Sequence, residues 1–386
     1  MTLDEEETDV TGDDVTGETR EDRRSWPRRV LAGTVVVVME FVACVVGSVA
    51  AQDEPRTASG RPDFTGTYDP ATVTPLQRPV ELGDRLSLTR EQAAEIARER
   101  AEFAANAGRW SSPERDAPPV GGASAFGFED DPEAGEALGA GRVGGYNWFW
   151  VDQGDSAFQI DGEFRTSIIT DPQNGRMPAM TEDGREKAAA RVAAFRHENT
   201  GTAWWLGREV GPYDDIELRP LAERCILSRS RSGPPARPSL YNNTKRIVQT
   251  EDHFMVLAEQ IHDARIVRLN SEHPPPDVTF FMGDSIGYWE GDTLVVETTN
   301  FREHLDTSVQ RKVTERFSRL GPDTLLYGFT VEDPATWIEP WSGEYPWRQT
   351  SAKLYEYACH EGNYAMGGIM RGARILEREA LEAGNR

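Results

Sequence analysis

Two short segments hold the side chains best suited to chemistry in this sequence. His262 is followed by Asp263 and, two residues later, by Arg265, while His360 is followed directly by Glu361. Imidazole and carboxylate groups exchange protons near neutral pH, as general acid–base catalysis requires. These five residues are therefore the candidate catalytic residues of a periplasmic hydrolase or lyase. In the alternative interpretation the histidines are hydrogen-bonded structural residues, and Asp263 and Arg265 form a salt bridge that closes the fold.

Metal binding is the other chemistry that these segments could support. Glu259 and His262 resemble a ligand pair, but side chains alternate faces along a continuous strand, so these two would point in opposite directions. His360 and Glu361 would also diverge unless they lie in a turn, which Gly362 allows. The sequence contains no HExxH motif, P-loop or dinucleotide fingerprint. We therefore expect no metal and no cofactor.

Aromatic residues point to a different function, which is recognition of a ligand. Trp337 and Trp341 belong to an aromatic cluster, and Trp289 and Tyr357 lie on either side of it in the sequence. Aromatic faces stack on sugar rings and on apolar molecules, and the mouth of a β-barrel is a common place for such ligands. We expect these four residues to bind a small apolar or glycosidic ligand. Two alternatives stay open: the tryptophans plug the end of a barrel, or they form an exposed patch for an envelope structural or assembly partner.

The elements that must position these residues are mostly short strands. From Lys245 onward, β patterns alternate with turn residues, and the expected strands are 246–250, 253–258, 264–269, 286–289, 293–299, 313–318, 324–331, 337–339 and 353–358. No long helical segments separate these strands, so we expect antiparallel pairing, and about nine strands favour a closed barrel. Pro340 and Pro346 predict a rigid loop. The predicted fold is mainly β, an antiparallel β-barrel or strongly curved sheet with a few peripheral helices.

Further elements are expected around this sheet. Thr89 and Gln92 form a capping-box pattern at the start of a helix that runs to about Asn106. The other expected elements are a strand near residues 63–68, a hairpin of strands 165–170 and 176–180, a helix over 182–196, and a carboxyl-terminal helix packed through Met366, Ile369, Ala373 and Leu376. Residues 107–145 are rich in glycine, proline and acids and predict an irregular insertion.

Several long sequence blocks carry a resemblance to a known family. They are Tyr241-Asn242-Asn243, Ile261-His262-Asp263-Ala264-Arg265-Ile266, Gly283-Asp284-Ser285 with Trp289–Val296, Asp323–Tyr327 and Tyr355–Tyr364. They are similar to a large, functionally uncharacterised family of exported proteins from soil and marine bacteria. The resemblance covers roughly residues 60–376 and departs before Arg23 and near 120–145. It implies export and a shared β-rich fold, and it implies no activity. Gly287-Tyr288-Trp289 also resembles the Gly-x-Trp motif of lipocalin-like barrels.

The amino-terminal segment indicates the compartment. Residues 1–22 form an acidic leader that we expect to be disordered. Arginines from Arg23 onward precede an apolar run over 30–51, which as a helix would span about 33 Å, enough to cross a bilayer. Residues 23–51 are therefore a cleaved signal peptide, a single membrane anchor or a buried helix of a soluble protein. We expect one of the first two, and both place a single β-rich domain, residues 60–378, outside the cytoplasm. There, Cys225 and Cys359 form a disulfide or remain buried thiols.

Charge and length limit the classes of partner. The 386 residues include 65 acidic and 42 basic side chains, for a formal net charge of −23. So acidic a chain does not displace counterions from phosphates, which excludes sequence-independent nucleic-acid binding. It is equally unsuited to adhesion to anionic lipid through surface charge. We expect a monomer whose partner is a small molecule and whose contact with membrane, if any, runs through residues 30–51.

Overall fold

A computed structural model describes residues 54–107, 151–195, 201–228, 232–303 and 307–384. All of them belong to one compact unit, Gln52–Arg386. The acidic leader, the apolar run and nearly all of the expected insertion at 107–145 lie outside the described residues. None of the helices in the described ranges has both the length and the apolar character needed to cross a bilayer.

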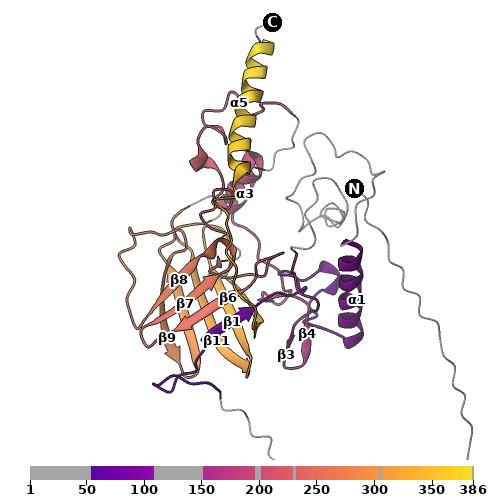
Figure 1. Ribbon diagram of the computed structural model, residues 1–386, viewed down its shortest axis with the longest axis vertical. Helices are drawn as coiled ribbons and strands as arrows, with labels where there is room; N and C mark the ends of the chain where they lie inside the picture. Colours follow the sequence, from indigo (N-terminus) through magenta and orange to yellow (C-terminus); the bar gives the residue numbers. More distant parts are fainter. Residues whose placement is uncertain (1–53, 108–150, 196–200, 229–231, 304–306, 385–386) are drawn as a thin grey trace, which may run out of the picture. The chain divides into compact units, whose positions relative to one another are not determined.

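The centre of the fold is a closed, nine-stranded β-barrel (Figure 1). Around the barrel the strands follow one another in the order β1 (Gly66–Asp69), β6 (Lys245–Gln249), β7 (His253–Ala258), β8 (Ala264–Leu269), β9 (Asp284–Glu290), β10 (Thr293–Thr299), β11 (Lys312–Gly321), β12 (Thr324–Glu332) and β13 (Trp341–Gln349). β13 pairs with β1, which closes the ring. The prediction of a mainly β fold with a barrel is confirmed.

One neighbouring pair in the ring is parallel, so the expectation of purely antiparallel pairing is wrong. β8 and β9 run in the same direction, with Arg268 opposite Ile286. The physical reason is one of parity, because strand directions cannot alternate all the way round a ring with an odd number of strands. Residues 270–283 carry the chain back between these two strands. The Asn300 side chain supports this crossover by donating to the carbonyls of Pro274, Pro275 and Val278.

β13 occupies sequence for which a rigid loop was expected. Its proline, Pro346, has no N–H to donate. Glu344 donates its backbone N–H to Ile168, on the side away from β12. Alternate residues face the same side, so the Pro346 nitrogen also faces that side, between the short stretches where β5 (Ile169–Asp171) and β1 pair with β13. The expected strands at 337–339 and 353–358 are not formed, although Trp337 makes an isolated bridge to Met180.

The barrel interior is filled with side chains. Inward-facing aromatic rings contact one another, with ring centroids 4.7 Å apart for Tyr327 and Trp347 and 5.0 Å apart for Phe254 and Phe317. Trp347 has no exposed surface and Trp341 only 3%. The inside of the barrel is thus a packed core, which is one of the two arrangements found in barrels of about eight strands.

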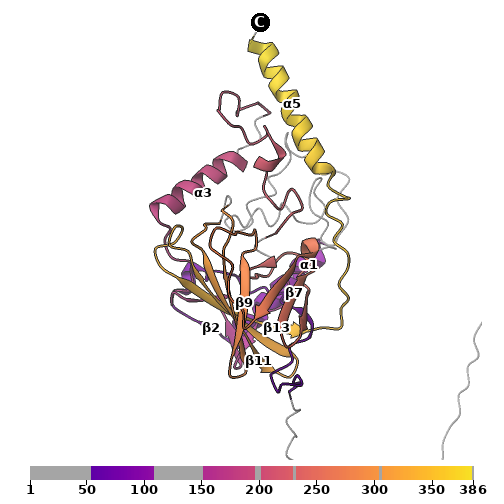
Figure 2. The same cartoon turned by 90° about the vertical axis from the view of Figure 1, so that its left-hand side faces the viewer.

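Smaller elements surround the barrel (Figures 1 and 2). They are the sheet β2 (Ser87–Leu88), β4 (Glu163–Arg165) and β3 (Gln159–Ile160), the helices α1 (Arg90–Ala107), α3 (Glu182–Phe195) and α5 (Tyr364–Gly384), and the short 3-10 turns η1 (Val80–Leu82), η3 (Ile216–Leu218) and η4 (Gln260–His262). Both capping-box hydrogen bonds of α1 are present. α5 buries Met366 and Ala373, and Ala373 packs with Trp205. Of the expected hairpin, the turn forms, the first strand is divided between the end of β4 and β5, and 176–180 contributes only the isolated bridge of Met180.

Candidate functional site

Asp263 lies at one end of the barrel, between β7 and β8. It follows a tight turn in which Ile261 and His262 have positive φ angles of 59° and 45°, so that Ile261 is buried and His262 is exposed. The Ser232 hydroxyl donates to the Asp263 carboxylate at 2.5 Å. Partial burial is the main reason that the pKa of Asp263 is raised above its usual value of 3.8, against the opposing effects of Ser232, His262 and Lys245. The turn therefore places a carboxyl group with a raised pKa beside an exposed imidazole.

Replacing Asp263 by asparagine should stabilise the protein at neutral pH. The folded state holds the Asp263 proton more tightly than the unfolded chain does, so ionisation of Asp263 costs stability as the pH rises through and above its unfolded pKa. We expect the free energy of unfolding of Asp263→Asn to exceed that of the wild type at pH 7. The difference should shrink towards zero below about pH 4. Urea unfolding across this pH range tests this, and a variant that is less stable at pH 7 than at pH 4, relative to wild type, would contradict it.

Arg265 does not pair with Asp263. Its guanidinium points into the barrel and forms a bidentate ion pair with Glu315, with 2.8 Å between Nη2 and Oε1. Arg265 is 4% exposed and Glu315 has no exposed surface. The Tyr327 hydroxyl donates to Glu315 at 2.6 Å and completes the group. The alternative of a structural salt bridge between Asp263 and Arg265 is therefore wrong, because the carboxylate that pairs with Arg265 comes from β11, fifty residues further along the chain.

Residues 232–236 cover the barrel end above this ion pair. Ala236 donates its N–H to the Tyr327 hydroxyl and accepts a hydrogen bond from the Tyr345 hydroxyl, both at 2.9 Å. Burial raises the pKa of both tyrosines, so both are neutral at physiological pH. The two tyrosine hydroxyls and the backbone N–H and C=O of Ala236 thus all have partners inside the protein. This arrangement is that of a closed plug rather than an open ligand site.

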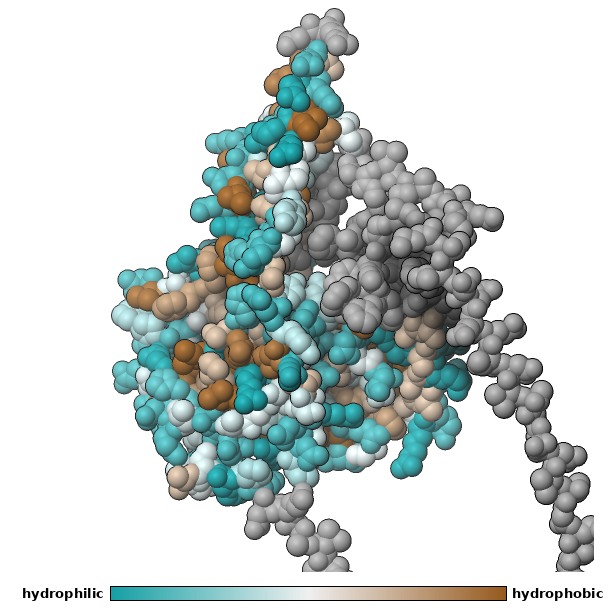
Figure 3. All heavy atoms as spheres, in the orientation of Figure 1, coloured by the Kyte–Doolittle hydropathy of each residue, from teal (hydrophilic) through white to brown (hydrophobic). Residues whose placement is uncertain are grey.

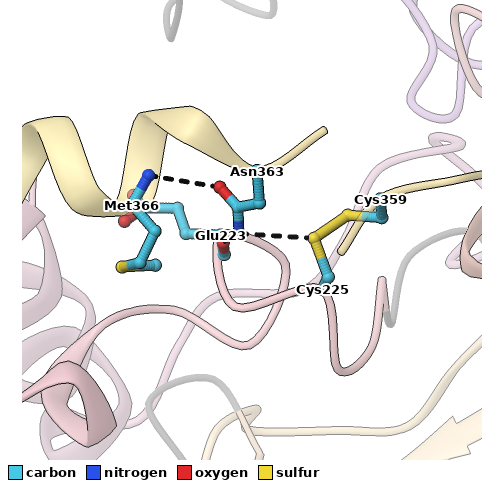
Figure 4. Close-up of a disulfide and its surroundings, with 5 residues drawn as sticks. All are labelled: Glu223, Cys225, Cys359, Asn363 and Met366. Carbon is cyan, nitrogen blue, oxygen red and sulfur yellow. Dashed lines mark hydrogen bonds between the residues drawn. A yellow bond between two sulfur atoms is a disulfide. The ribbon is translucent and has the colours of Figure 1, made fainter. Parts of the chain in front are cut away.

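His360 and Glu361 lie in a different part of the fold. They are exposed in the turn that precedes α5. This turn follows directly after Cys359, whose disulfide with Cys225 is drawn in Figure 4 and confirms the disulfide prediction. Asn363 fixes this turn by donating to the Glu223 carbonyl at 2.7 Å. The five candidate catalytic residues thus divide between the barrel end and this turn. Across the described ranges, no three histidine, cysteine or acidic side chains are placed to hold a metal ion.

The four candidate ligand-binding aromatics are also dispersed. Trp341 is buried in the barrel, and half-buried Trp337 packs edge-on against it, 6.4 Å between centroids. Trp289 packs on Phe64 at 5.6 Å. Tyr357 lies on residues 350–358, which we call the strap, the segment that leads from β13 to Cys359. The aromatic cluster is therefore neither an open stacking platform nor an exposed patch.

An open hollow of about 570 Å³ lies between the strap and the outer wall of the barrel. Its wall side is a row of three outward-facing residues directly opposite one another on neighbouring strands: Thr67 on β1, Arg246 on β6 and Leu257 on β7. Its strap side is formed by residues 350–354, including Lys353 and Leu354. Clefts that hold small molecules have volumes of roughly 300–1,000 Å³, so this hollow is of suitable size. A second hollow, beside Asp69 and Arg348, measures about 20 Å³, room for one water.

A second charged group that sequence reasoning missed lies on the outer wall beside the β8–β9 crossover. The His273 Nδ1 is 2.7 Å from Asp284, which also binds Arg268, and the His273 Nε2 is 3.6 Å from Glu297. Lys312 pairs with Glu297. These ion pairs and the two contacts of His273 extend across four strands and connect residues 270–283 to the barrel wall. Nothing in the local sequence indicated them, because the five residues become neighbours only when the strands pair.

Comparison with known proteins leaves this geometry as the guide to function. The sequence matches no protein-family model and no curated protein.

Proposed function

We propose that this protein binds a small amphipathic ligand in the hollow between the strap and the outer barrel wall. The observation that carries the proposal is the hollow itself, which offers about 570 Å³ of space bounded by both apolar and cationic side chains. Leu257 and Leu354 supply the apolar contact, and Arg246 and Lys353 supply charge. Of the apolar and glycosidic ligands expected from sequence, this composition favours an apolar one with a polar end.

The barrel interior supports the proposal indirectly. In lipocalin-type barrels the ligand occupies the lumen. Here the lumen is occupied by aromatic side chains such as Tyr327, Tyr345 and Trp347, all without exposed surface. A ligand therefore has to bind outside the barrel. The strap supplies the second wall that an outer surface alone lacks.

The disulfide supports a further part of the proposal, that the protein works outside the cytoplasm. The bond between Cys225 and Cys359 joins residues 134 apart in the sequence. Structural disulfides persist in oxidising compartments such as the periplasm and the cell exterior. Fractionation of the producing cell tests this location.

Filling the hollow should abolish binding. Ala352 is exposed on the strap and lines the hollow, so a tryptophan at this position occupies the space of the ligand without disturbing the core. We expect Ala352→Trp to lower ligand affinity at least tenfold in isothermal titration against a panel of fatty acids, phenolics and glycosides. The melting temperature should change little.

The matched control for this test is Ala380→Trp, which places the same side chain on the exposed surface of α5. This variant should bind as the wild type does. If no member of the panel binds the wild type, or if Ala352→Trp binds as well as Ala380→Trp does, the hollow is not the site.

Acid–base catalysis is a second candidate, favoured by one observation. Asp263 has a raised pKa and lies directly beside exposed His262, and such perturbed groups concentrate at functional sites. A screen with chromogenic esters and glycosides tests this candidate. Activity that survives in both His262→Ala and Asp263→Asn would remove it, whereas a loss of activity in both variants without a loss of stability would support it.

A further inference from the structure

We infer that the ligand of the hollow is a single-chain carboxylate, with its headgroup at Arg246 and Lys353 and its chain along the outer faces of β6, β7 and β8. This inference rests on the proposed function and adds to it the chemical class of the ligand. Two neighbouring features of the barrel wall support it. One is a pair of cationic side chains, and the other is a row of apolar side chains.

The cationic feature faces the hollow from both sides. Arg246 projects from the wall and donates from Nη1 to the Thr67 hydroxyl at 2.7 Å, which orients the guanidinium and leaves its other N–H groups for a ligand. Lys353 approaches from the strap. Among the described residues, neither cation forms an ion pair with a carboxylate, although the chain carries 65 acidic side chains. A guanidinium matches the two oxygens of a carboxylate, and the ammonium adds a second charge-assisted hydrogen bond.

The apolar feature is the next row of outward-facing residues on the same strands. Val248 on β6 is opposite Met255 on β7, and Met255 is opposite Ile266 on β8. Val248 is 37% and Ile266 58% exposed, and Figure 3 shows hydrophobic side chains gathered on this face of the barrel. Two residues along a strand correspond to about 7 Å, so this row begins within the length of a short alkyl chain from Arg246. A headgroup at Arg246 therefore places its chain on this row.

The charge of the protein identifies the source of the carboxylate as a free molecule rather than a membrane. A net charge of −23 opposes approach to an anionic lipid surface. The hollow itself is lined by two cations, Arg246 and Lys353, and their positive charge attracts a small anion at close range. A soluble fatty-acid-type carboxylate combines that charge with a chain that fits the apolar row.

The test compares two probes that differ only in the headgroup, octanoate and 1-octanol, by isothermal titration of the full-length protein. We expect octanoate to bind at least tenfold more tightly than octanol. Arg246→Gln and Lys353→Gln should each weaken octanoate binding about tenfold, since a charge-assisted hydrogen bond is lost, and should leave octanol binding unchanged. The control Arg371→Gln removes an exposed arginine from α5 and should bind both probes as the wild type does.

A second comparison tests the apolar row separately. Ile266→Ser should weaken octanoate binding severalfold and leave butyrate binding unchanged, because each buried methylene contributes about a fourfold factor in affinity.

Each of the following binding results would contradict a different part of the inference. Equal binding of octanoate and octanol overturns the carboxylate inference and leaves the hollow as a site for a neutral amphiphile. Binding of neither probe, together with failure of the wider panel, overturns the proposed function as well. Binding to anionic lipid vesicles but not to octanoate overturns the choice of a free carboxylate. Octanoate binding that is unaffected in both Arg246→Gln and Lys353→Gln places the headgroup elsewhere.

Discussion

Replacing Glu315 by alanine should lower the free energy of unfolding by about 3–5 kcal/mol. Glu315 has no exposed surface, and its carboxylate is the partner of the buried Arg265 guanidinium and of the Tyr327 hydroxyl. Removing it leaves a positive charge and a hydroxyl inside the barrel without the carboxylate that both contact, and both groups are buried from solvent in the folded protein. Urea unfolding followed by tryptophan fluorescence measures the loss.

An ion pair one residue away provides the control. Arg316, the next residue on β11, points outward and pairs with Glu290, and these two side chains are 50% and 49% exposed. Because water screens that pair, Glu290→Ala should cost no more than about 1 kcal/mol. Replacing both buried partners, as in Arg265→Met with Glu315→Leu, should recover much of the stability lost in Glu315→Ala, since no unpaired charge remains. Equal losses for Glu315→Ala and Glu290→Ala would contradict this account.

Removing the disulfide should have the second-largest effect. The bond between Cys225 and Cys359 joins residues 134 apart, and loss of a native disulfide typically lowers the free energy of unfolding by about 2–5 kcal/mol. In the folded protein the same bond fixes the turn that begins α5, together with the hydrogen bond from Asn363 to Glu223. Cys225→Ser with Cys359→Ser should therefore lower stability and speed amide hydrogen exchange in α5 more than in the barrel strands.

Two controls accompany the disulfide prediction. Reduction of the wild-type protein should reproduce the effect of the double variant, and Cys44→Ser should have none, because the bond does not involve Cys44. An unchanged urea midpoint in the double variant, with unchanged exchange in α5, would show that the disulfide does not hold this part of the fold.

Local patterns in the sequence were sufficient for most individual strands. Alternating side chains bounded by turn residues predicted β6, β7, β8, β10 and β12 nearly at their observed limits. The capping box at Thr89 and Gln92 likewise predicted the start of α1, because both of its hydrogen bonds span only three residues. Each of these features depends on neighbours in the sequence.

The structural predictions that proved wrong concern residues whose placement depends on a partner far away in the sequence. Pro346 predicted a loop and is tolerated in β13 because its nitrogen faces a stretch where neither β5 nor β1 pairs. The parallel pairing of β8 and β9 follows from the number of strands in the closed ring, which no single strand reveals. The two-residue spacing predicts that Arg265 pairs with Asp263, whereas its partner Glu315 lies on β11, three strands further round the barrel.

The candidate site shows the same division. The sequence alone determined a β-rich fold, the strand periodicity that faces Arg246 and Leu257 outward, and the two cysteines that form the disulfide. Only the tertiary structure decided that the barrel interior is filled and that β1, β6 and β7 align Thr67, Arg246 and Leu257 beneath the strap. The reason is physical: the direction of a side chain follows from the local period of two along a strand, whereas the space in front of it depends on which remote segments pack there.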